Sequence, residues 1–107
     1  MNTTVRDNPT ESRYEIHVGE QLAGFPAYKL GNHQVAFTHT EIDPAFTGQG
    51  LAKQLVTEVL DDARRRGLAV LPFCPYVRKF IAKNAATYLD LVPDKDRDRF
   101  ELPKLAQ

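Results

Sequence analysis

Two glycines occur where a predicted strand gives way to a predicted helix, in Thr47-Gly48-Gln49-Gly50-Leu51-Ala52. A helix N-terminus exposes N–H groups without intrahelical partners and carries the positive end of the helix dipole, so it attracts phosphate. Gly48 and Gly50 place no Cβ between the backbone and an anion. Lys53 puts a cation in the first turn, which the dipole disfavours unless an anion binds nearby. The segment therefore indicates a phosphate-binding turn, with a simple tight connection as the alternative.

Two common phosphate-binding motifs do not fit this turn. A P-loop has Gly-Lys-Ser/Thr after its glycine loop, whereas this chain has Gly50-Leu51-Ala52. A dinucleotide-binding fingerprint needs a third small residue within an early βαβ unit, and its next strand ends in an acidic residue. Here three predicted strands precede the turn, and the strand after the helix ends in Phe73-Cys74. Both motifs are therefore excluded.

Three residues are candidates for acid–base or nucleophilic chemistry. Cys74 follows a predicted parallel strand, at the end of the sheet where open sheets place ligands. It can act as a nucleophile or as an acid for a leaving group, or it can be a small buried apolar residue. Glu41 and His39 are two residues apart on a predicted strand and therefore point to the same side. Either can take a proton from an amine, and the alternatives are a solvent-facing carboxylate and a hydrogen-bonded structural histidine.

The elements that position these residues can be read from hydrophobic periodicity. Arg13 to Val18 alternates as a half-buried strand does, and two further extended segments run from about Gln21 to Leu30 and from about His33 to Ile42. A tight turn is expected at Gly31-Asn32. One apolar helix face follows, made of Leu51, Ala52, Leu55, Val56, Val59, Leu60 and Ala63.

The remaining elements complete an α/β (α+β) fold with a mixed sheet. Leu68 to Phe73 is a short apolar run typical of a buried strand, and the helix before it provides the crossover that a parallel strand needs. A second helix is expected from about Tyr76 to Ala86, followed by a packing element at Tyr88 to Val92. The predicted order is an antiparallel three-strand meander, a helix, a parallel strand and a second helix.

The chain has 107 residues, of which 42% are apolar, and this suits one domain. We expect a flexible N-terminal tail at residues 1–12, the folded domain at 13–93 and a polar C-terminal tail at 94–107, because both ends are rich in polar residues. Basic and acidic residues number 14 each, which disfavours broad nucleic-acid binding.

The single cysteine permits neither an internal disulfide nor a thiolate metal cluster, so no metal site is expected and a reducing compartment fits. Neither a signal peptide nor an apolar run of the roughly 20 residues that span a membrane is apparent in the sequence. We therefore expect a soluble cytoplasmic protein, with the choice between monomer and homodimer left open.

The chain resembles the GNAT superfamily of acetyltransferases. The superfamily signature, Gln/Arg-x-x-Gly-x-Gly/Ala at a strand-to-helix junction, is matched by Ala45 to Gly50, with Ala45 in place of the first Gln/Arg. A closer resemblance is to the short one-domain N-acetyltransferase-like branch. The shared segments are His39-Thr40-Glu41-Ile42, Gly48 to Lys53, Cys74 to Ile81 and Tyr88-Leu89. Together they extend over about Arg13 to Val92.

The resemblance implies an acetyltransferase that moves acetyl from acetyl-coenzyme A to an unidentified amine or other nucleophile. The coenzyme would lie where the third strand and the Cys74 strand splay apart, with Cys74 at its acyl end. Cys74, Glu41 and His39 are then the expected catalytic residues. The expected coenzyme-binding residues are Glu41, Ile42, Thr47, Gly48, Gln49, Gly50, Leu51, Ala52, Lys53 and Tyr76. The alternative is a non-catalytic module or sensor that binds acetyl-coenzyme A on the same scaffold.

Overall fold

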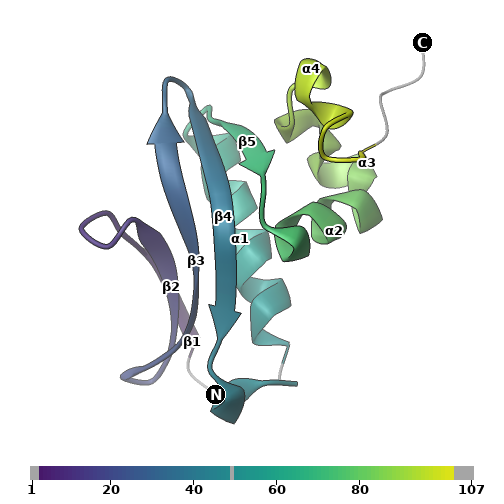
Figure 1. Cartoon of the computed structure of the whole chain (residues 1–107). Helices are drawn as coiled ribbons and strands as arrows, with labels where there is room; N and C mark the ends of the chain where they lie inside the picture. Colours follow the sequence, from purple (N-terminus) through teal and green to yellow (C-terminus); the bar gives the residue numbers. More distant parts are fainter. Residues whose placement is uncertain (1–2, 49, 103–107) are drawn as a thin grey trace.

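A five-stranded sheet with its strands in sequence order forms the centre of the protein (Figure 1). The computed structural model describes residues 3–48 and 50–102. The strands are β1 (Thr3–Asn8), β2 (Arg13–Val18), β3 (Gln21–Gly31), β4 (Gln34–Ile42) and β5 (Ala69–Pro72). Strands β1 to β4 are antiparallel neighbours, and β5 runs parallel to β4. The α+β class, the meander and the parallel last strand are therefore confirmed.

The turns of the meander differ from the prediction by one residue at one place. Gly19 and Glu20 connect β2 and β3, since Val18 pairs with Gln21. Between β3 and β4, Gly31 still pairs with Gln34, so the two-residue loop is Asn32-His33 rather than Gly31-Asn32. Of the two loop residues, His33 has a positive φ, of 60°.

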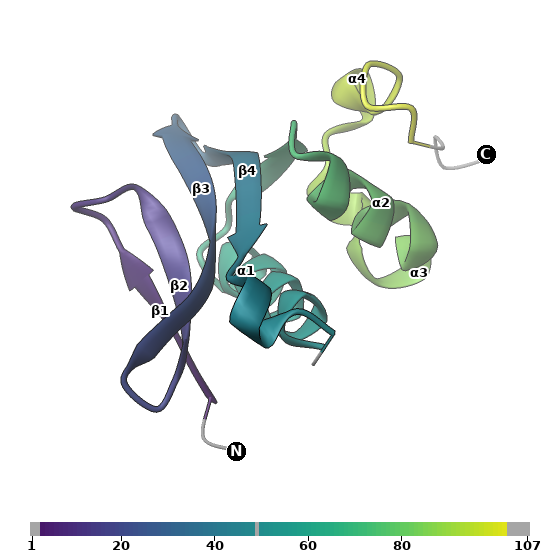
Figure 2. The ribbon, with the colours of Figure 1, turned by 60° about the horizontal axis from the view of Figure 1, so that its bottom comes forward.

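Helix α1 (Leu51–Arg65) packs against β2, β3, β4 and β5 with the apolar face predicted from its periodicity (Figure 2). Its buried residues are Leu51, Leu55, Val56, Val59, Leu60 and Ala63. Leu55, Leu60 and Ala63 are fully buried, as is Phe37 on the sheet. Burial of a side chain of Leu or Phe size contributes about 1.5–3 kcal/mol, so this face is the main attachment of α1 to the sheet.

The shorter helical elements come after β4 and β5 in the chain. A 3₁₀ turn, η1 (Pro44–Phe46), comes directly after β4. After β5 come α2 (Pro75–Lys83), α3 (Ala85–Tyr88), the 3₁₀ turn η2 (Leu89–Leu91) and α4 (Asp94–Arg97). Helix α2 ends earlier than the predicted Ala86, because Asn84 leaves the helical region at φ −123° and its side-chain amide donates to the carbonyl of Phe80.

The expectation of a frayed N-terminal tail is wrong for Thr3–Asn8, which form β1. This strand pairs with β2 over its whole length. Two side-chain hydrogen bonds also tie it down, from the Gln54 amide to the Thr3 hydroxyl at 2.9 Å and from the Tyr28 hydroxyl to the Asp7 carboxylate at 2.6 Å. β1 is an edge strand, and edge strands tolerate polar and charged residues, so its sequence does not show the apolar alternation of β2.

The expectation of a solvated C-terminal tail is wrong for residues 94–102. The guanidinium of Arg97 is buried and donates to the carbonyls of Val92 at 2.9 Å and Leu89 at 3.1 Å. Phe100 and Leu102 are also buried, and Phe100 packs edge-on against Phe73 with 5.0 Å between ring centroids. Residues 1–2 and 103–107 of the expected tails lie outside the described residues.

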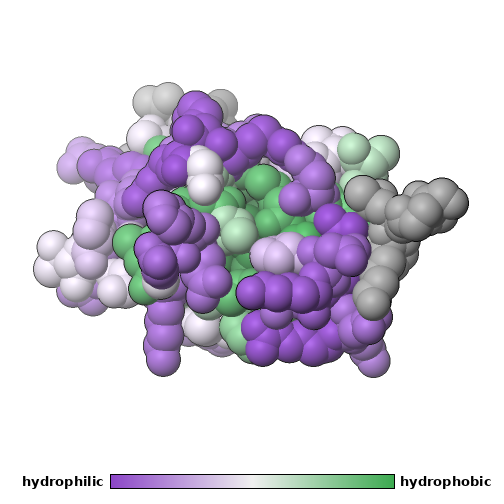
Figure 3. Space-filling view, turned by 90° about the horizontal axis from the view of Figure 1, so that it is seen from above, coloured by the Kyte–Doolittle hydropathy of each residue, from purple (hydrophilic) through white to green (hydrophobic). Residues whose placement is uncertain are grey.

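The end of the molecule that carries α4 and the β3–β4 turn shows apolar atoms at its centre, ringed by hydrophilic ones (Figure 3). A cavity of about 300 Å³ at the end of α1 is lined by Arg64, Gly67, Leu68, Ala69, Asp90, Leu91 and Pro93. The glycine turn lies at the N-terminal end of α1, opposite to this cavity (Figure 1). The N-terminal end of α1 therefore adjoins the glycine turn, whereas its C-terminal end adjoins this cavity.

Candidate functional site

Strands β4 and β5 are paired over only part of β4. The parallel register runs from Gln34 opposite Ala69 to Phe37 opposite Pro72, and the Cys74 N–H donates to the Phe37 carbonyl at 2.8 Å just beyond it. β4 continues to Ile42, whereas the chain after β5 turns into α2. Within the described residues, the last part of β4 therefore has a strand neighbour only on its β3 side.

A β-bulge at Thr38 lies at the point where the two strands separate. Tyr28 of β3 pairs with Phe37, but the next residue, Ala27, pairs with His39, so Thr38 is an extra residue on β4. A bulge bends its strand and increases the local twist, and this one comes directly after Phe37, the last residue of β4 that pairs with β5.

The bulge also decides which way the following residues point. The Asp43 N–H donates to the Ala23 carbonyl, so the odd-numbered residues after the bulge direct their backbone groups toward β3. Since successive residues alternate, Thr40 and Ile42 direct their N–H and C=O groups toward the side that β5 has left. An extended polar ligand can pair there as an added strand does.

The glycine turn presents an uncapped helix N-terminus. Gly48 and Gly50 have φ of 87° and 76°, values that L side chains rarely adopt, and no atom lies within 4 Å of the position of a Cβ at either residue. Gly50 is the N-cap of α1 and supplies no side-chain cap, and the first turn contains no acidic residue. The first helical bond runs from the Gln54 N–H to the Gly50 carbonyl, so the amides of Leu51 to Lys53 stand ahead of it.

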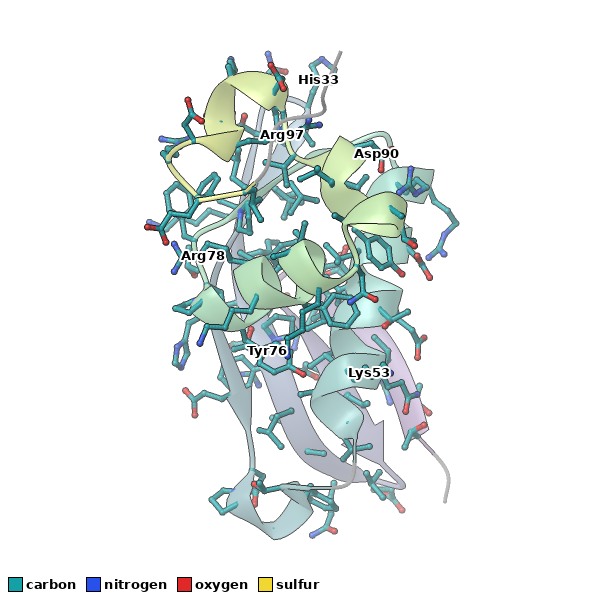
Figure 4. All side chains as sticks on the ribbon, turned by 90° about the vertical axis from the view of Figure 1, so that its right-hand side faces the viewer. His33, Lys53, Tyr76, Arg78, Asp90 and Arg97 are labelled. Atoms are coloured by element: carbon teal, nitrogen blue, oxygen red, sulfur yellow. The ribbon has the colours of Figure 1, made fainter. Side chains whose placement is uncertain are left out.

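A hollow of about 250 Å³ joins the glycine turn to the open side of β4. It is lined by Ile42, Phe46, Thr47, Gly48, Gly50, Leu51, Ala52, Lys53 and Tyr76. Figure 4 shows Tyr76 below α2, in the space between β4 and the first half of α1, with Lys53 on α1 beside it. A polar helix terminus, a cation and an apolar wall therefore meet in one place.

The Cys74 thiol lies beside the open part of β4, at the start of α2. Cys74 is 3% exposed, and its Sγ is 3.1 Å from the hydroxyl of Thr40, with either atom able to donate. The Cys74 carbonyl accepts the first helical hydrogen bond of α2 from Arg78. Thr40 was not among the predicted site residues, because only the bulge turns its side chain toward the thiol.

His39 and Glu41 form a pair on the other face of β4. His39 Nε2 is 2.9 Å from a Glu41 carboxylate oxygen, and the two side chains are 61% and 59% exposed. The prediction that they point to the same side is confirmed. Since adjacent residues on a strand face opposite ways, Thr40 and Cys74 lie on one face and this pair on the other. Glu41 also lines a cavity of about 180 Å³ with Gly24 and Phe25.

A family model for GCN5-related N-acetyl-transferases matches residues 13–91, most of the chain. The chain belongs to the GCN5-related N-acetyltransferase family. The family's match includes β2 to β5, the glycine turn and Cys74.

Comparisons with individual proteins are consistent with membership of this family. Protein NATD1 of Bos taurus is 34% identical over 55 residues, and protein NATD1 of Xenopus tropicalis is 33% identical over 55 residues. Each alignment covers 51% of this chain, which spans about half the length of these curated relatives. The solution structure of a GCN5-like protein from Staphylococcus aureus has a TM-score of 0.62 at 21% identity, covers 84% of this chain and 87% of its own, and shows the same fold.

Within this GCN5-related fold, the predicted coenzyme-binding residues mostly come together. Ile42, Tyr76 and the described residues of the range Thr47–Lys53 line one hollow, while Gln49 lies outside the described residues. Phe46 also lines it and was missed, because no sequence pattern distinguishes it from a residue of the core. Glu41 does not line the hollow, because its side chain lies on the opposite face and its backbone groups point toward β3.

Larger hollows lie away from these residues. One of about 390 Å³ is lined by Arg64, Ala85, Ala86, Thr87, Leu89 and Asp90. Its two charged residues, Arg64 and Asp90, bind each other at 2.8 Å and 3.0 Å, so the pair is already satisfied. Among the described residues, no group of His, Cys, Asp and Glu is suited to hold a metal ion, and no helix has the length and apolar character needed to cross a membrane. We therefore regard the hollow beside the glycine turn as the candidate site.

Proposed function

We propose that this protein is an acetyltransferase that uses acetyl-coenzyme A and transfers the acetyl group to an amine or a similar nucleophile. The observation that carries the proposal is the hollow that joins the uncapped N-terminus of α1 to the open side of β4. It offers unpaired amides for an anion and a strand edge for an extended arm. The family of the chain supports the same cofactor.

In this proposal each part of the hollow holds one part of the coenzyme. The amides and side chains of Thr47 to Lys53 hold the pyrophosphate, because the helix dipole and the Lys53 cation both favour negative charge there. The backbone groups of Thr40 and Ile42, which point to the open side of β4, pair with the pantetheine arm, and Tyr76 covers it from the side of α2. Acetyl-coenzyme A supplies an activated acetyl thioester that can accept a nucleophile.

Two roles for Cys74 fit its position. As a nucleophile, its thiolate attacks the acetyl carbon, a new C–S bond forms, and the bond to the sulfur of coenzyme A breaks, so that coenzyme A leaves as a thiolate and takes up a proton. An amine then displaces the cysteine sulfur. Alternatively, the Cys74 thiol gives its proton to the departing thiolate during direct attack by the amine. Thr40 orients the thiol in both cases.

Amine activation falls to the pair on the outer face. The amine must lose a proton before or as it attacks, and His39 or Glu41 can accept it directly or through water. The hydrogen bond between them orients the imidazole and stabilises the positive charge that it gains as a base. The amine itself attacks from the Cys74 face of β4, where the acetyl group lies.

One observation favours a second candidate, a non-catalytic module that binds acetyl-coenzyme A. Ala45 stands where the GNAT signature has Gln or Arg, so one side-chain contact of the signature is absent from that position. The Ala45 N–H is bound to the Asp43 carboxylate at 2.8 Å, within the turn itself. Turnover separates this candidate from the enzyme, since both bind the coenzyme.

Calorimetry with acetyl-coenzyme A tests the shared assignment. The wild-type protein should bind it, and Gly50→Glu should abolish binding by blocking the turn and repelling phosphate. Gly67→Glu is the matched control, because Gly67 also has a positive φ of 69° with no atom within 4 Å of its Cβ position. Equal affinities of the two variants would contradict the phosphate cradle, and no heat with wild-type protein would contradict both candidates.

Mass spectrometry then separates the two roles of Cys74. Incubation with acetyl-coenzyme A should add one acetyl group to Cys74 if the thiol is the nucleophile. Full activity of Cys74→Ala without any adduct in the wild type would remove the covalent route. The proposal includes a cytoplasmic location, since a reacting thiol needs a reducing compartment.

A further inference from the structure

The arginines of the described chain divide into paired and unpaired groups. Most have a carboxylate partner: Arg13 with Glu15, Arg64 with Asp90, Arg65 and Arg66 with Asp62, Arg97 with Asp94, and Arg99 with Asp96. Within the described residues, Arg6 and Arg78 have no such ion pair. Arg6 is exposed on the edge strand β1, whereas Arg78 is half-buried at the start of α2. Arg78 is therefore an unpaired cation held partly out of water.

Arg78 faces away from the coenzyme hollow. It lies two positions after Tyr76, and two positions on an α-helix correspond to a rotation of about 200°. Tyr76 lines the hollow, so the Arg78 side chain leaves α2 on the opposite side. Figure 4 agrees, with Arg78 at the edge of α2 far from Lys53. The phosphates assigned to the turn at Thr47–Lys53 are therefore not the partner of Arg78.

The position of Arg78 points instead to the reacting end of the site. Arg78 is one helical turn after Cys74, and its N–H donates to the Cys74 carbonyl at 3.0 Å. Helix α2 packs against β4, where Thr40 touches the Cys74 thiol. His39 and Glu41 flank Thr40 and point to the outer face of β4. The backbone of Arg78 is thus within one helical turn of the Cys74–Thr40 contact.

We propose that Arg78 binds an anionic group of the acyl acceptor, which is then a small amine carrying a carboxylate or a phosphate. The inference rests on the proposed acetyl transfer. The anionic group of the acceptor would lie at Arg78 and its amine beside Cys74, at the acetyl group. A guanidinium binds either anion through two parallel N–H···O bonds, which fixes the orientation as well as the affinity of the acceptor. Arg78 acts here on specificity and takes no proton.

The test compares matched amines in the presence of acetyl-coenzyme A. L-Leucine, L-leucinamide and isoamylamine share a side chain but differ in the carboxylate, and O-phosphoethanolamine with ethanolamine forms the phosphate pair. For wild-type protein we expect kcat/KM to be about 10- to 100-fold higher for at least one anionic member than for its neutral partner. Arg78→Ala should remove that preference, and Arg78→Lys should retain part of it as a point charge.

Two controls make the outcome decisive. Arg6→Ala removes the other unpaired arginine and should leave both kcat/KM and the preference unchanged. Calorimetry of acetyl-coenzyme A binding should give equal affinities for wild type and Arg78→Ala. Binding of acetyl-coenzyme A with no preference for an anionic amine, with no acetylation in the panel, or with a preference that survives in Arg78→Ala overturns the inference. No binding of acetyl-coenzyme A overturns the proposed function itself.

Discussion

The Thr40 hydroxyl and the Cys74 thiol meet at 3.1 Å across the point where β4 and β5 separate. Thr40 belongs to the strand whose edge is open, and Cys74 caps the helix that covers the opening. This contact is therefore the direct link between the predicted arm-binding edge and the predicted reacting group. It also depends on the bulge at Thr38, which turns Thr40 inward.

Thr40→Val keeps the shape of the side chain but removes its hydroxyl. We expect the free energy of unfolding to fall by about 1 kcal/mol, since one part-buried hydrogen bond is lost. Acetyl adduct formation at Cys74, followed by mass spectrometry over time, should slow by about tenfold because the thiol loses its orientation. Thr40→Ser keeps the hydroxyl and should behave like wild type. Equal rates for Val and Ser would contradict a role for Thr40.

Glu41→Gln removes the carboxylate charge on the outer face without changing the size of the side chain. Because Glu41 is 59% exposed, unfolding should change by less than about 0.5 kcal/mol. Acetyl transfer should fall by about 100-fold or more if the pair activates the amine. His39→Gln should cost a similar factor, and the double variant little more, since the two residues act together.

The control for that pair is Glu20→Gln, the same change in the exposed turn between β2 and β3. It should leave transfer rates as they are. Coenzyme affinity measured by calorimetry should be the same in all these variants, because the outer face does not line the hollow. A Glu41→Gln protein with full activity would remove the base assignment.

Tyr14 and Tyr28 should make stability sensitive to alkaline pH. Burial raises the pKa of both phenols, and so do their 2.6 Å hydrogen bonds to Asp62 and Asp7. Above about pH 10 the unfolded chain loses these phenolic protons while the folded protein keeps them, so the free energy of unfolding falls as pH rises. Urea denaturation between about pH 8 and pH 11 should show this loss.

The double variant Tyr14→Phe/Tyr28→Phe tests the origin of that loss. At about pH 8 it should be less stable by about 2–4 kcal/mol, because two hydrogen bonds to carboxylates are absent. Its stability should then decline less steeply toward pH 11 than that of wild type. Parallel pH curves for the two proteins would show that other groups cause the alkaline effect.

Arg97→Met tests whether the C-terminal segment belongs to the folded core. Arg97 donates charged hydrogen bonds to two carbonyls from a buried position, and their loss leaves both acceptors unsatisfied. We expect the free energy of unfolding to fall by about 2–4 kcal/mol in urea denaturation. Lys95→Met, on the exposed side of the same helix, should change it by less than about 0.5 kcal/mol. Similar stabilities would indicate that residues 94–102 contribute little.

Local periodicity was enough to predict the elements that carry the glycine turn. Helix α1 buries one face against the sheet, and strands β2 to β4 contribute apolar residues to the same core, so their sequences show a recognisable apolar repeat. The parallel direction of β5 followed from the crossover alone. The hollow beside Gly48 and Gly50 was therefore predictable in outline, apart from Phe46.

The parts that sequence did not predict depend on distant partners. β1 is polar because it is an edge strand, and its place is decided by pairing with β2 and by Asp7 and Thr3. Arg97 looks like a solvated charge until its two carbonyl acceptors are known. The Thr38 bulge has no local signature either, because it exists only relative to β3. Hence it became visible only in the structure that Thr40, rather than His39 or Glu41, faces the thiol.

The open side of β4 bears on the aggregation and the stability of the protein in a cell. A strand with free N–H and C=O groups can pair with other chains, and here such an edge lies inside the sheet rather than at its border. A ligand that binds along this edge prevents its pairing with other chains. It also raises the free energy of unfolding in proportion to the logarithm of the ligand concentration. Under the proposed function, the amount of folded protein would increase with the concentration of coenzyme A. The bound cofactor would also prevent self-association through this edge.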